Sequence, residues 1–311
     1  MLRNIALISM FGFLLSSCSG RESFLNQTII DSNLKTYSAD EKQAIFKDLA
    51  IVENICFEGV IPAKQKQYIA TAGGPGARKS TTLERFLAQE AASLSNFAYL
   101  DPDQRALKFM AHTYQNKSLN AQQIATQTDY SLIQKSAYEK WRDASNYITA
   151  TLLEKAFRSG YSVVHGTTST GPALPDLLKK IKAAGYKVTF LLCGSSDQFR
   201  RDAINYRLAE QRFYQSTPED AVTKGLAFPQ RMQFYFEQGD TLMTYWSDSL
   251  DHSEQLAATF IDGTVTILDK VAYENFVQKY EADRAYLAIQ QNLNLLPWEE
   301  IIAAYQHRFK K

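Results

Sequence analysis

Hydrophobic residues in the middle of the chain follow two alternating patterns. Continuous apolar runs at 68–72, 161–164 and 188–192 are short and bounded by turn residues, which is typical of buried strands. The segments between them, such as 131–160, carry apolar residues at helical spacing. Strands that alternate with helices predict an α/β fold, in which a parallel sheet has helices on both faces.

Two helical extensions are predicted to flank this core domain, which we delimit at 66–280. The preceding segment, 21–65, is polar and broken except for "SADEKQAIFKDLAIVENICF", which opens with a capping box at Ser38. The tail, 281–311, predicts a pair of helices broken at Pro297. The first extension is expected to pack on the domain and the tail to pack on the domain or on a partner, and neither is expected to carry chemistry.

The first 18 residues are a different kind of segment. "MLRNIALISMFGFLLSSCSG" has a basic start, an apolar stretch too short to span a bilayer, and small residues before Cys18, as in a signal peptide. "LSSC" resembles a bacterial lipobox, so residues 1–18 predict a lipoprotein leader with Cys18 as a lipid anchor in the cell envelope membrane. The alternatives are an unprocessed leader, which leaves the protein in the cytoplasm, and export as a secreted effector.

Composition indicates a globular protein. Of 311 residues, 45% are hydrophobic and 22% are charged, and the net charge is +1. This balance gives no electrostatic case for binding nucleic acid. Cys56 and Cys193 lie beside apolar, strand-like residues, so buried free thiols are expected rather than a disulfide or a metal site.

Residues 71–82, "TAGGPGARKSTT", are close to a phosphate-binding loop (P-loop). The P-loop pattern is a glycine, four residues, a second glycine, a lysine, and then serine or threonine. A predicted strand runs into the motif and a predicted helix follows, which is the context in which backbone N–H groups bind phosphate oxygens. Lys79 would contact the β- and γ-phosphates, and the Ser80 hydroxyl would ligate Mg²⁺. The nucleotide-binding candidates are Gly73, Gly74, Pro75, Gly76, Ala77, Arg78, Lys79, Ser80 and Thr81.

Arg78 departs from the pattern, because it stands where the second glycine belongs. That glycine normally lets the backbone come close to phosphate, and a Cβ atom costs room there. The arginine side chain could instead point outward or add a phosphate contact. The hypothesis is a loop that still binds nucleotide with some loss of affinity. The alternative is a glycine-rich turn that only opens a helix.

Two carboxylates follow the next apolar segment, in "NFAYLDPDQR". Asp101 and Asp103 come after a predicted strand, at the sheet edge where ligands bind in open α/β folds. In a kinase, one acid can organise the waters of Mg²⁺ while the other accepts a proton from the attacking hydroxyl. The alternative is a plain turn, because "DPD" is favourable turn chemistry.

With these segments in order, the chain resembles the zeta toxin family of P-loop kinases over about residues 66–280. The resemblance is carried by "GGPGARKST", "YLDPDQR", "GYSVVHGTTST", "GYKVTFLLCG", "RRDAINYRLAEQRFYQSTPEDAV" and "DTLMTYWSD". It implies a P-loop NTPase-type fold that transfers the γ-phosphate of ATP, with Mg²⁺, to a hydroxyl of a small molecule. The toxins phosphorylate UDP-N-acetylglucosamine, and relatives of the fold phosphorylate NAD or chloramphenicol, so the fold does not name the substrate. An antitoxin-like partner is a further expectation.

The family pattern implies roles for charged residues of the cleft. Asp103 matches the general base, with Asp101 as its neighbour at the strand end. Arg207 and Arg212 are the implied clamps on the γ-phosphate, since a planar guanidinium suits phosphoryl oxygens. Arg201 stays an alternative, because the spacing before "STPED" differs from that of the toxins.

The loop "VVHGTTST" brings a second departure from the family. His165 stands where the family usually has a glutamate that contacts the substrate. Histidine can hydrogen-bond a sugar or a phosphate but cannot replace a carboxylate that accepts two hydroxyls. A different substrate is one hypothesis, and a structural histidine is the other. Thr167 and Thr168 are candidate hydroxyl donors to the substrate, and Trp246 falls where the family contacts adenine, although a core position is equally open for it.

The sequence therefore predicts an active small-molecule kinase. Two alternatives stay open, since Arg78 and His165 both depart from the family. One is a relative that binds nucleotide but catalyses weakly. The other is a lipid-anchored protein that keeps the fold without enzymatic activity.

Overall fold

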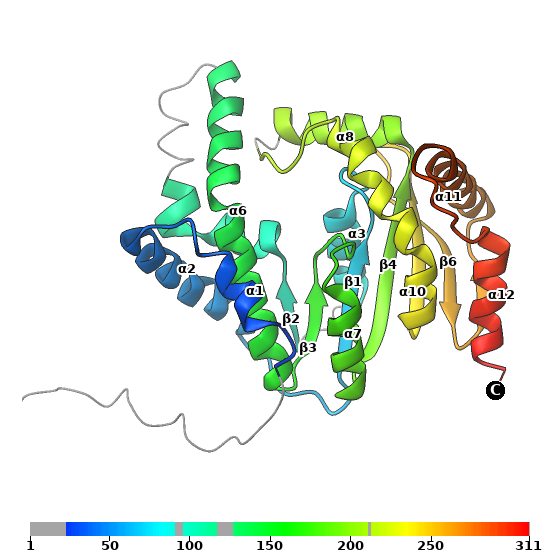
Figure 1. Cartoon of the computed structure of the whole chain (residues 1–311), viewed down its shortest axis with the longest axis horizontal. Coiled ribbons are helices and arrows are strands. Elements are labelled where there is room, and N and C mark those ends of the chain that lie inside the picture. Colours follow the sequence, from blue (N-terminus) through cyan, green and yellow to red (C-terminus); the bar gives the residue numbers. More distant parts are fainter. Residues whose placement is uncertain (1–22, 91–95, 117–126, 211–212, 311) are drawn as a thin grey trace, which may run out of the picture.

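A central β-sheet organises the chain (Figure 1). The computed structural model describes residues 23–90, 96–116, 127–210 and 213–310, and within them the strands lie in the order β2-β3-β1-β4-β5-β6-β7. They are β1 (Gln67–Ala72), β2 (Phe97–Leu100), β3 (Ser162–His165), β4 (Lys187–Ser195), β5 (Thr241–Ser247), β6 (Gln255–Ile261) and β7 (Thr264–Ile267). The first five are parallel, whereas β6 and β7 pair antiparallel at one edge. The predicted α/β sheet is confirmed, but the short, mostly exposed β7 gives no apolar run that would predict the final hairpin.

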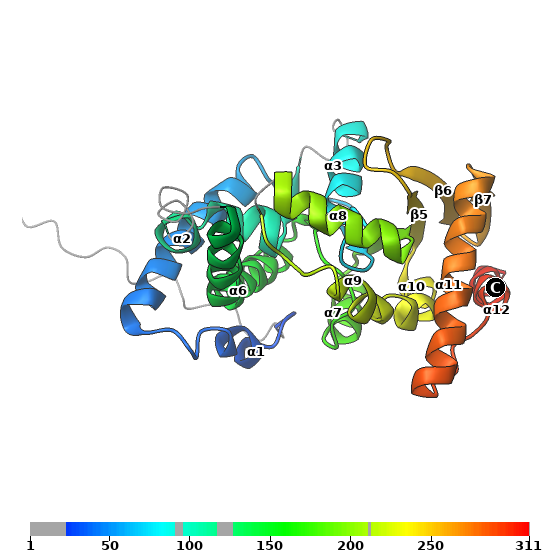
Figure 2. The same ribbon diagram turned by 90° about the horizontal axis from the view of Figure 1, so that it is seen from above.

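Helices cover both faces of the sheet. They are α1 (Gln27–Ser32), α2 (Ala39–Phe57), α3 (Lys79–Gln89), α6 (Gln127–Arg158), α7 (Leu174–Ala183), α8 (Asp197–Glu210), α9 (Asp220–Thr223), α10 (Met232–Gln238), α11 (Lys270–Gln291) and α12 (Trp298–Arg308). Figure 2 shows α3 on one side of the strands and α7 and α10 on the other. Successive residues of a strand point to opposite faces. Ile69 accordingly packs with Leu83 of α3, whereas Tyr68 and Ala70 belong to the larger core on the other side.

The N-terminal extension is helical, as predicted. α2 begins at a capping box, in which Ser38 Oγ accepts the Glu41 N–H and the Glu41 carboxylate accepts the Ser38 N–H. Ile45 and Val52 of this helix are buried, and α2 packs on α6 and β2. The extension therefore completes the core on the side of β2.

The C-terminal segment adds two helices to the same core. α11 ends at Gln291 and α12 begins after Pro297, so the predicted break is confirmed. α11 extends to both sides of residue 280, where the sequence places a domain boundary. Trp298 is 3% exposed and packs on Phe276 with ring centroids 5.6 Å apart, which ties α12 to α11.

The structure describes two of the three cysteines and none of the predicted leader. Cys56 and Cys193 are buried and free, as predicted. Within the ranges that the structure describes, no helix is both long and apolar enough to cross a membrane. The predicted leader, with Cys18, lies outside the described residues.

Candidate active site

A glycine loop connects β1 to α3, as the motif predicts. The backbone φ is 78° at Gly76 and 54° at Arg78, so both residues adopt the left-handed conformation. A Cβ atom at Gly74 would lie 2.1 Å from Arg200 Nη1, and one at Gly76 would lie 2.3 Å from the Arg200 carbonyl oxygen. Gly76 therefore requires glycine, because the backbone of the first turn of α8 packs against the loop there, whereas the atom nearest to Gly74 is the end of the Arg200 side chain.

Lys79 is the first residue of α3, and its side chain folds back onto the loop. Its Nζ donates a hydrogen bond to the Gly74 carbonyl oxygen at 2.9 Å. Burial lowers the pKa of this ammonium to about 8, because desolvation disfavours a charge. Ser80 and Thr81 follow in the first turn of α3, whose N-terminus has no side-chain cap. Uncapped N–H groups and the helix dipole make this terminus suited to a phosphate.

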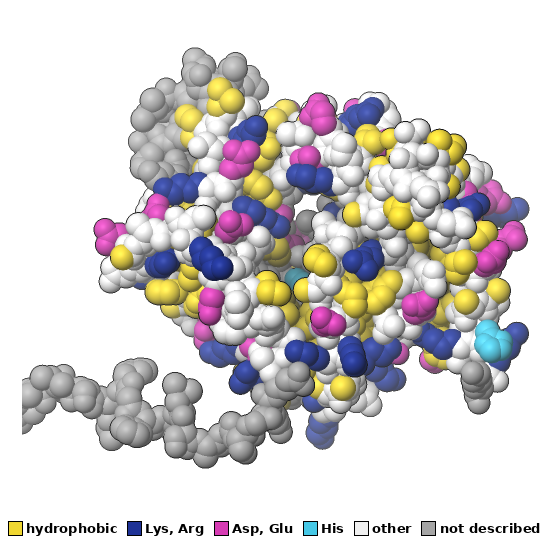
Figure 3. All heavy atoms as spheres, viewed as in Figure 1, with side chains coloured by type: hydrophobic (Ala, Val, Ile, Leu, Met, Phe, Trp, Pro, Cys, Tyr) yellow, Lys and Arg dark blue, Asp and Glu magenta, His cyan; other side chains and the backbone are white. Residues whose placement is uncertain are grey.

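A cleft of about 440 Å³ opens beside the loop. Figure 3 shows the surface hollowed between α6 and α8, with acidic and basic side chains at the rim. Of the sequence candidates, the cleft brings together Pro75, Gly76, Arg78, Lys79, Ser80, Asp101, Asp103, Thr167, Thr168 and Arg207. Gly74 and Ala77 line a second cavity instead. Residues after β1, β2 and β3 thus face one space, as expected for a ligand site at the carboxyl edge of a parallel sheet.

Asp101 braces the turn that follows β2. Its Oδ1 accepts the backbone N–H groups of Asp103 and Gln104, both at 2.7 Å, and the residue is 7% exposed. Burial, followed by the neighbouring Asp103 carboxylate, raises the pKa of Asp101 to about 6. A Cβ atom at Gly166 would lie only 1.9 Å from its Oδ2. Asp101 therefore has the turn-forming role as well as a place in the cleft.

Asp103 is ion-paired with Arg142, a residue that the sequence does not single out. The carboxylate accepts a hydrogen bond from Arg142 Nη1. Arg142 lies on α6, and its guanidinium is 5.6 Å from the ring centroid of Tyr138, one turn earlier. Both α6 residues line the cleft. Nothing in the sequence distinguishes this arginine from the other charged residues of a long helix, so only the fold reveals it.

Arg207 is the arginine that α8 brings into the cleft. It donates a hydrogen bond to Gln215 Oε1, and burial lowers the pKa of its guanidinium. Arg201, the alternative, is exposed and does not line the cleft. Arg212 lies outside the described residues. Lys224 also lines the cleft, which the sequence analysis missed.

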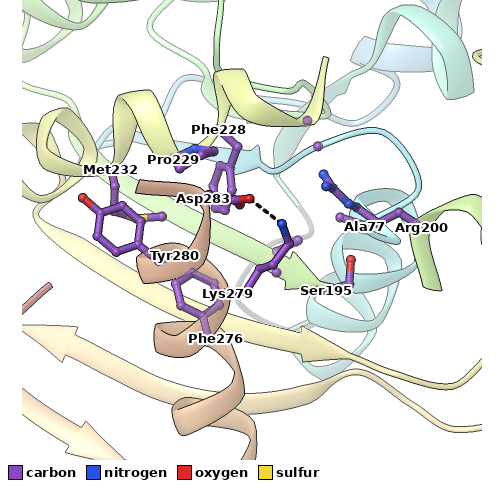
Figure 4. Close-up of a pocket in the computed structure, with 14 residues that line it drawn as sticks. Ala77, Ser195, Arg200, Phe228, Pro229, Met232, Phe276, Lys279, Tyr280 and Asp283 are labelled. Carbon is purple, nitrogen blue, oxygen red and sulfur yellow. Dashed lines mark hydrogen bonds and ion pairs between the residues drawn. The ribbon is translucent and has the colours of Figure 1, made fainter. Parts of the chain in front are cut away.

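The back of the glycine loop faces a second, small cavity, shown in Figure 4. Arg200 lines it, is 5% exposed and is ion-paired with Asp197. Lys279 of α11 contacts the same Asp197 at 2.9 Å and Asp283 at 2.5 Å. A chain of ion pairs therefore runs from α11 to Arg200, whose side chain lies against the glycine loop.

His165 and Trp246, like Gly73 and Thr81, are not among the residues that line the cleft. His165 Nδ1 lies 2.8 Å from the Tyr68 hydroxyl oxygen, and burial lowers the pKa of the imidazole to about 4, so it is neutral near pH 7. His165 thus contacts the buried Tyr68 of β1 and does not line the cleft. This placement agrees with the hypothesis of a structural histidine. Trp246 is 6% exposed and belongs to the hydrophobic core, and its strand, β5, packs on α11. The core alternative for Trp246 is confirmed.

The cleft fits a nucleoside triphosphate with Mg²⁺ in charge and in donor type. Lys79 and Arg207 offer positive charge to phosphate oxygens. Ser80, Asp101 and Asp103 offer hydroxyl and carboxylate oxygens, the ligands that Mg²⁺ prefers. These residues would hold both groups.

The fold is of the P-loop NTPase type. Strand β1, the glycine loop and α3 follow one another, and the cleft lies at the carboxyl edge of the parallel strands. The Zeta toxin family model matches residues 57–227. This match spans more than half of the chain, and the chain belongs to the zeta toxin family. No curated protein sequence matches the chain.

Two solved structures share the fold. The crystal structure of AvrRxo1-ORF1:-ORF2 with ATP matches with a TM-score of 0.54 and 13% identity, over 88% of this chain and 92% of that chain. The PezAT chromosomal toxin–antitoxin system of Streptococcus pneumoniae matches with a TM-score of 0.54 and 16% identity, over 89% of this chain and 99% of that chain. At these identities the likeness establishes a toxin-like, kinase-related fold and nothing about substrate.

Proposed function

We propose that this protein transfers the γ-phosphate of ATP to a hydroxyl group of a small molecule. The observation that carries the proposal is that Lys79, Asp103 and Arg207 line one cleft although three separate elements supply them. Phosphoryl transfer requires a cation at a phosphate loop, a carboxylate that accepts a proton and an arginine that binds the transferring phosphate. Lys79, Asp103 and Arg207 are residues of these three kinds. The crystallised relative with ATP is consistent with the choice of nucleotide.

The proposed step is an in-line displacement. The Asp103 carboxylate accepts the proton of the acceptor hydroxyl, and that oxygen forms a bond to the γ-phosphorus. The bond from the γ-phosphorus to the β–γ bridging oxygen breaks, so ADP leaves. Lys79 and Arg207 neutralise the charge on the transferring phosphoryl group. The ion pair with Arg142 holds the Asp103 carboxylate in place.

Mg²⁺ would be held by the Ser80 hydroxyl, with Asp101 near its waters. When bound, the ion neutralises charge on the β- and γ-phosphates. Asp101 keeps its other role in this arrangement, because its Oδ1 holds the turn that carries Asp103.

The acceptor is proposed to be a nucleotide sugar such as UDP-N-acetylglucosamine, or another nucleotide such as NAD. Arg142 and Lys224 line the cleft away from the phosphate loop, together with the Tyr138 ring. Cationic groups and an aromatic ring suit an acceptor that itself carries phosphates and a base. Thr167 and Thr168 offer hydroxyls for positioning it.

Two further proposals concern partners and localisation. An antitoxin-like protein would bind this chain, since similar structures come from a toxin–antitoxin system and a two-protein complex. Lipid attachment at Cys18 would place the protein in the cell envelope, or it would act as a secreted toxin or effector. Labelling cells with a fatty-acid probe tests the anchor, and equal labelling of wild type and Cys18→Ser would rule out Cys18 as the lipid site.

The kinase proposal is tested with the full chain, Mg²⁺, γ-labelled ATP and a panel of nucleotide sugars, NAD and cell extract. Label should move to an acceptor in the wild type and in neither Lys79→Ala nor Asp103→Asn. Asp103→Asn should still bind Mg-ATP, because it keeps the loop and Lys79. Binding without any transfer by the wild type would favour a nucleotide-binding protein that does not catalyse. Turnover by Asp103→Asn equal to wild type would remove Asp103 as the base.

A further inference from the structure

The side chain of Arg78 is held by the loop that connects β5 to β6. Its Nη1 donates to the carbonyl oxygens of Ser249 at 2.8 Å and His252 at 2.9 Å. Its Nε lies 2.9 Å from Glu254 Oε1. These three partners belong to the connection between β5 and β6, so the guanidinium is bound to protein rather than free to contact a phosphate.

Glu254 depends on this contact. Its side chain is 1% exposed, and its other oxygen is bound by Arg85 at 2.6 Å. Arg78 directly precedes α3 and Arg85 lies in the middle of that helix. Two arginines of one segment therefore pair with the same buried carboxylate. A buried carboxylate that loses one of its cationic partners is strongly destabilised. The bridge therefore constrains both the β5–β6 connection and the start of α3.

The backbone of Arg78 lies where the phosphate loop becomes the helix. Its φ of 54° is a left-handed conformation that is unfavourable for a residue other than glycine. Such a conformation persists only when surrounding contacts determine it. The Arg78 carbonyl oxygen also accepts the N–H of Thr82 at 2.9 Å, as the first hydrogen bond of α3. The contacts of the guanidinium thus fix the backbone of Arg78, which directly precedes Lys79.

We propose that Arg78, acting through Glu254, is a positioning residue for the phosphate loop. A glycine would adopt the left-handed conformation at this position without strain. Arg78 is held in that conformation by the contacts of its side chain with the β5–β6 connection. It holds the N–H groups and Lys79 in the arrangement that binds phosphates. Restoring the consensus glycine therefore loosens the loop and weakens nucleotide binding. The link to nucleotide rests on the proposed function, whereas the link to loop order does not.

The test measures amide hydrogen exchange of peptides covering residues 73–80 in the ligand-free full chain. Arg78→Gly and Glu254→Gln should each speed exchange in the loop about tenfold, because each removes the ion pair that joins the Arg78 guanidinium to the buried Glu254 carboxylate. Arg78→Lys should fall between them and wild type, because lysine keeps the charge but not the planar fork. Arg284→Gln is the control, since it removes an arginine that pairs with Glu281 within α11 and leaves both partners of Glu254 in place. Its loop exchange should match wild type.

The same variants are titrated with Mg-ATP. Arg78→Gly and Glu254→Gln should raise the Kd about tenfold, and the double variant should be no weaker than the weaker single, because both act through one bridge. Loop exchange within about twofold of wild type in both single variants overturns the proposal. If Arg78→Gly does not melt cooperatively, Glu254→Gln and Arg78→Lys decide the outcome. A wild type that binds no Mg-ATP refutes the proposed function, while the exchange data still decide the role of Arg78.

Discussion

Asp103 and Arg142 form an ion pair in the cleft, joining the turn after β2 to helix α6 across 39 positions of the chain. The carboxylate that is proposed to accept the proton is thus held by a residue on another element. A base must lie within hydrogen-bond reach of the hydroxyl that it activates. The pair therefore ties the reactivity of Asp103 to the position of α6.

Arg142→Gln should lower kcat by about 10²-fold and leave the KM for ATP within about twofold. The variant frees the Asp103 carboxylate from its anchor but leaves the phosphate loop intact. Steady-state kinetics that separate kcat from KM check this. Arg158→Gln, at the exposed end of the same helix where it pairs with Glu154, is the control and should behave as wild type. An unchanged kcat in Arg142→Gln would mean that Asp103 does not need its partner.

The affinity for Mg-ATP should fall as pH rises above about 8. Burial lowers the pKa of Lys79 to about 8, so the ammonium is charged below this pH and loses its proton above it. A bound phosphate favours the charged form, so binding above pH 8 must take up a proton, and the affinity drops by up to about tenfold for each pH unit. Calorimetric titrations between about pH 7.5 and 9.5 measure this. Lys79→Arg should give a flat profile, and a flat profile in wild type would show that Lys79 does not contact the phosphates.

His165 should make the folded state less stable as pH falls from 6.5 toward 4. Its pKa is about 4 in the folded protein against an ordinary value of 6.5. The unfolded chain therefore binds more protons in this window, and the free energy of unfolding rises with pH across it. The raised pKa of Asp101 acts in the opposite direction.

Comparison with His165→Gln separates the two groups. Denaturant unfolding of both proteins at several pH values should show the slope that is due to His165 only in wild type. Glutamine keeps a polar partner for the Tyr68 hydroxyl. Parallel pH profiles for the two proteins would contradict a buried, neutral histidine.

Gly166→Ala should destabilise the protein by about 2–4 kcal/mol. The new Cβ atom would meet Asp101 Oδ2 at 1.9 Å, so the carboxylate or the β3 loop must move. The movement would also shift the turn that carries Asp103, and activity should fall with stability. Thermal melting and kinetics check both effects. Gly171→Ala, in the same connection, meets no atom within 4 Å and should be tolerated.

Local spacing was enough to predict the sheet core and the phosphate loop. Strand β1, the glycine loop and α3 follow each other within 23 residues, from Gln67 to Gln89, and each has its own signature of apolar runs, glycines or helical spacing. The capping box at Ser38 and the break at Pro297 are equally local and equally confirmed. By contrast, β7 is short and exposed, so it has no signature of this kind.

The sequence by itself determined the P-loop with Lys79 and Ser80, the parallel α/β fold and the acidic pair after β2, because these depend on residue types at fixed short spacings. Arg207 became a candidate only through the resemblance to the zeta toxin family. Only the tertiary structure decided what surrounds them. It paired Asp103 with Arg142, turned His165 toward Tyr68 and bound Arg78 to Ser249, 171 positions later in the chain. Such contacts arise from the packing of distant elements, and no spacing along the chain encodes which side chains will meet.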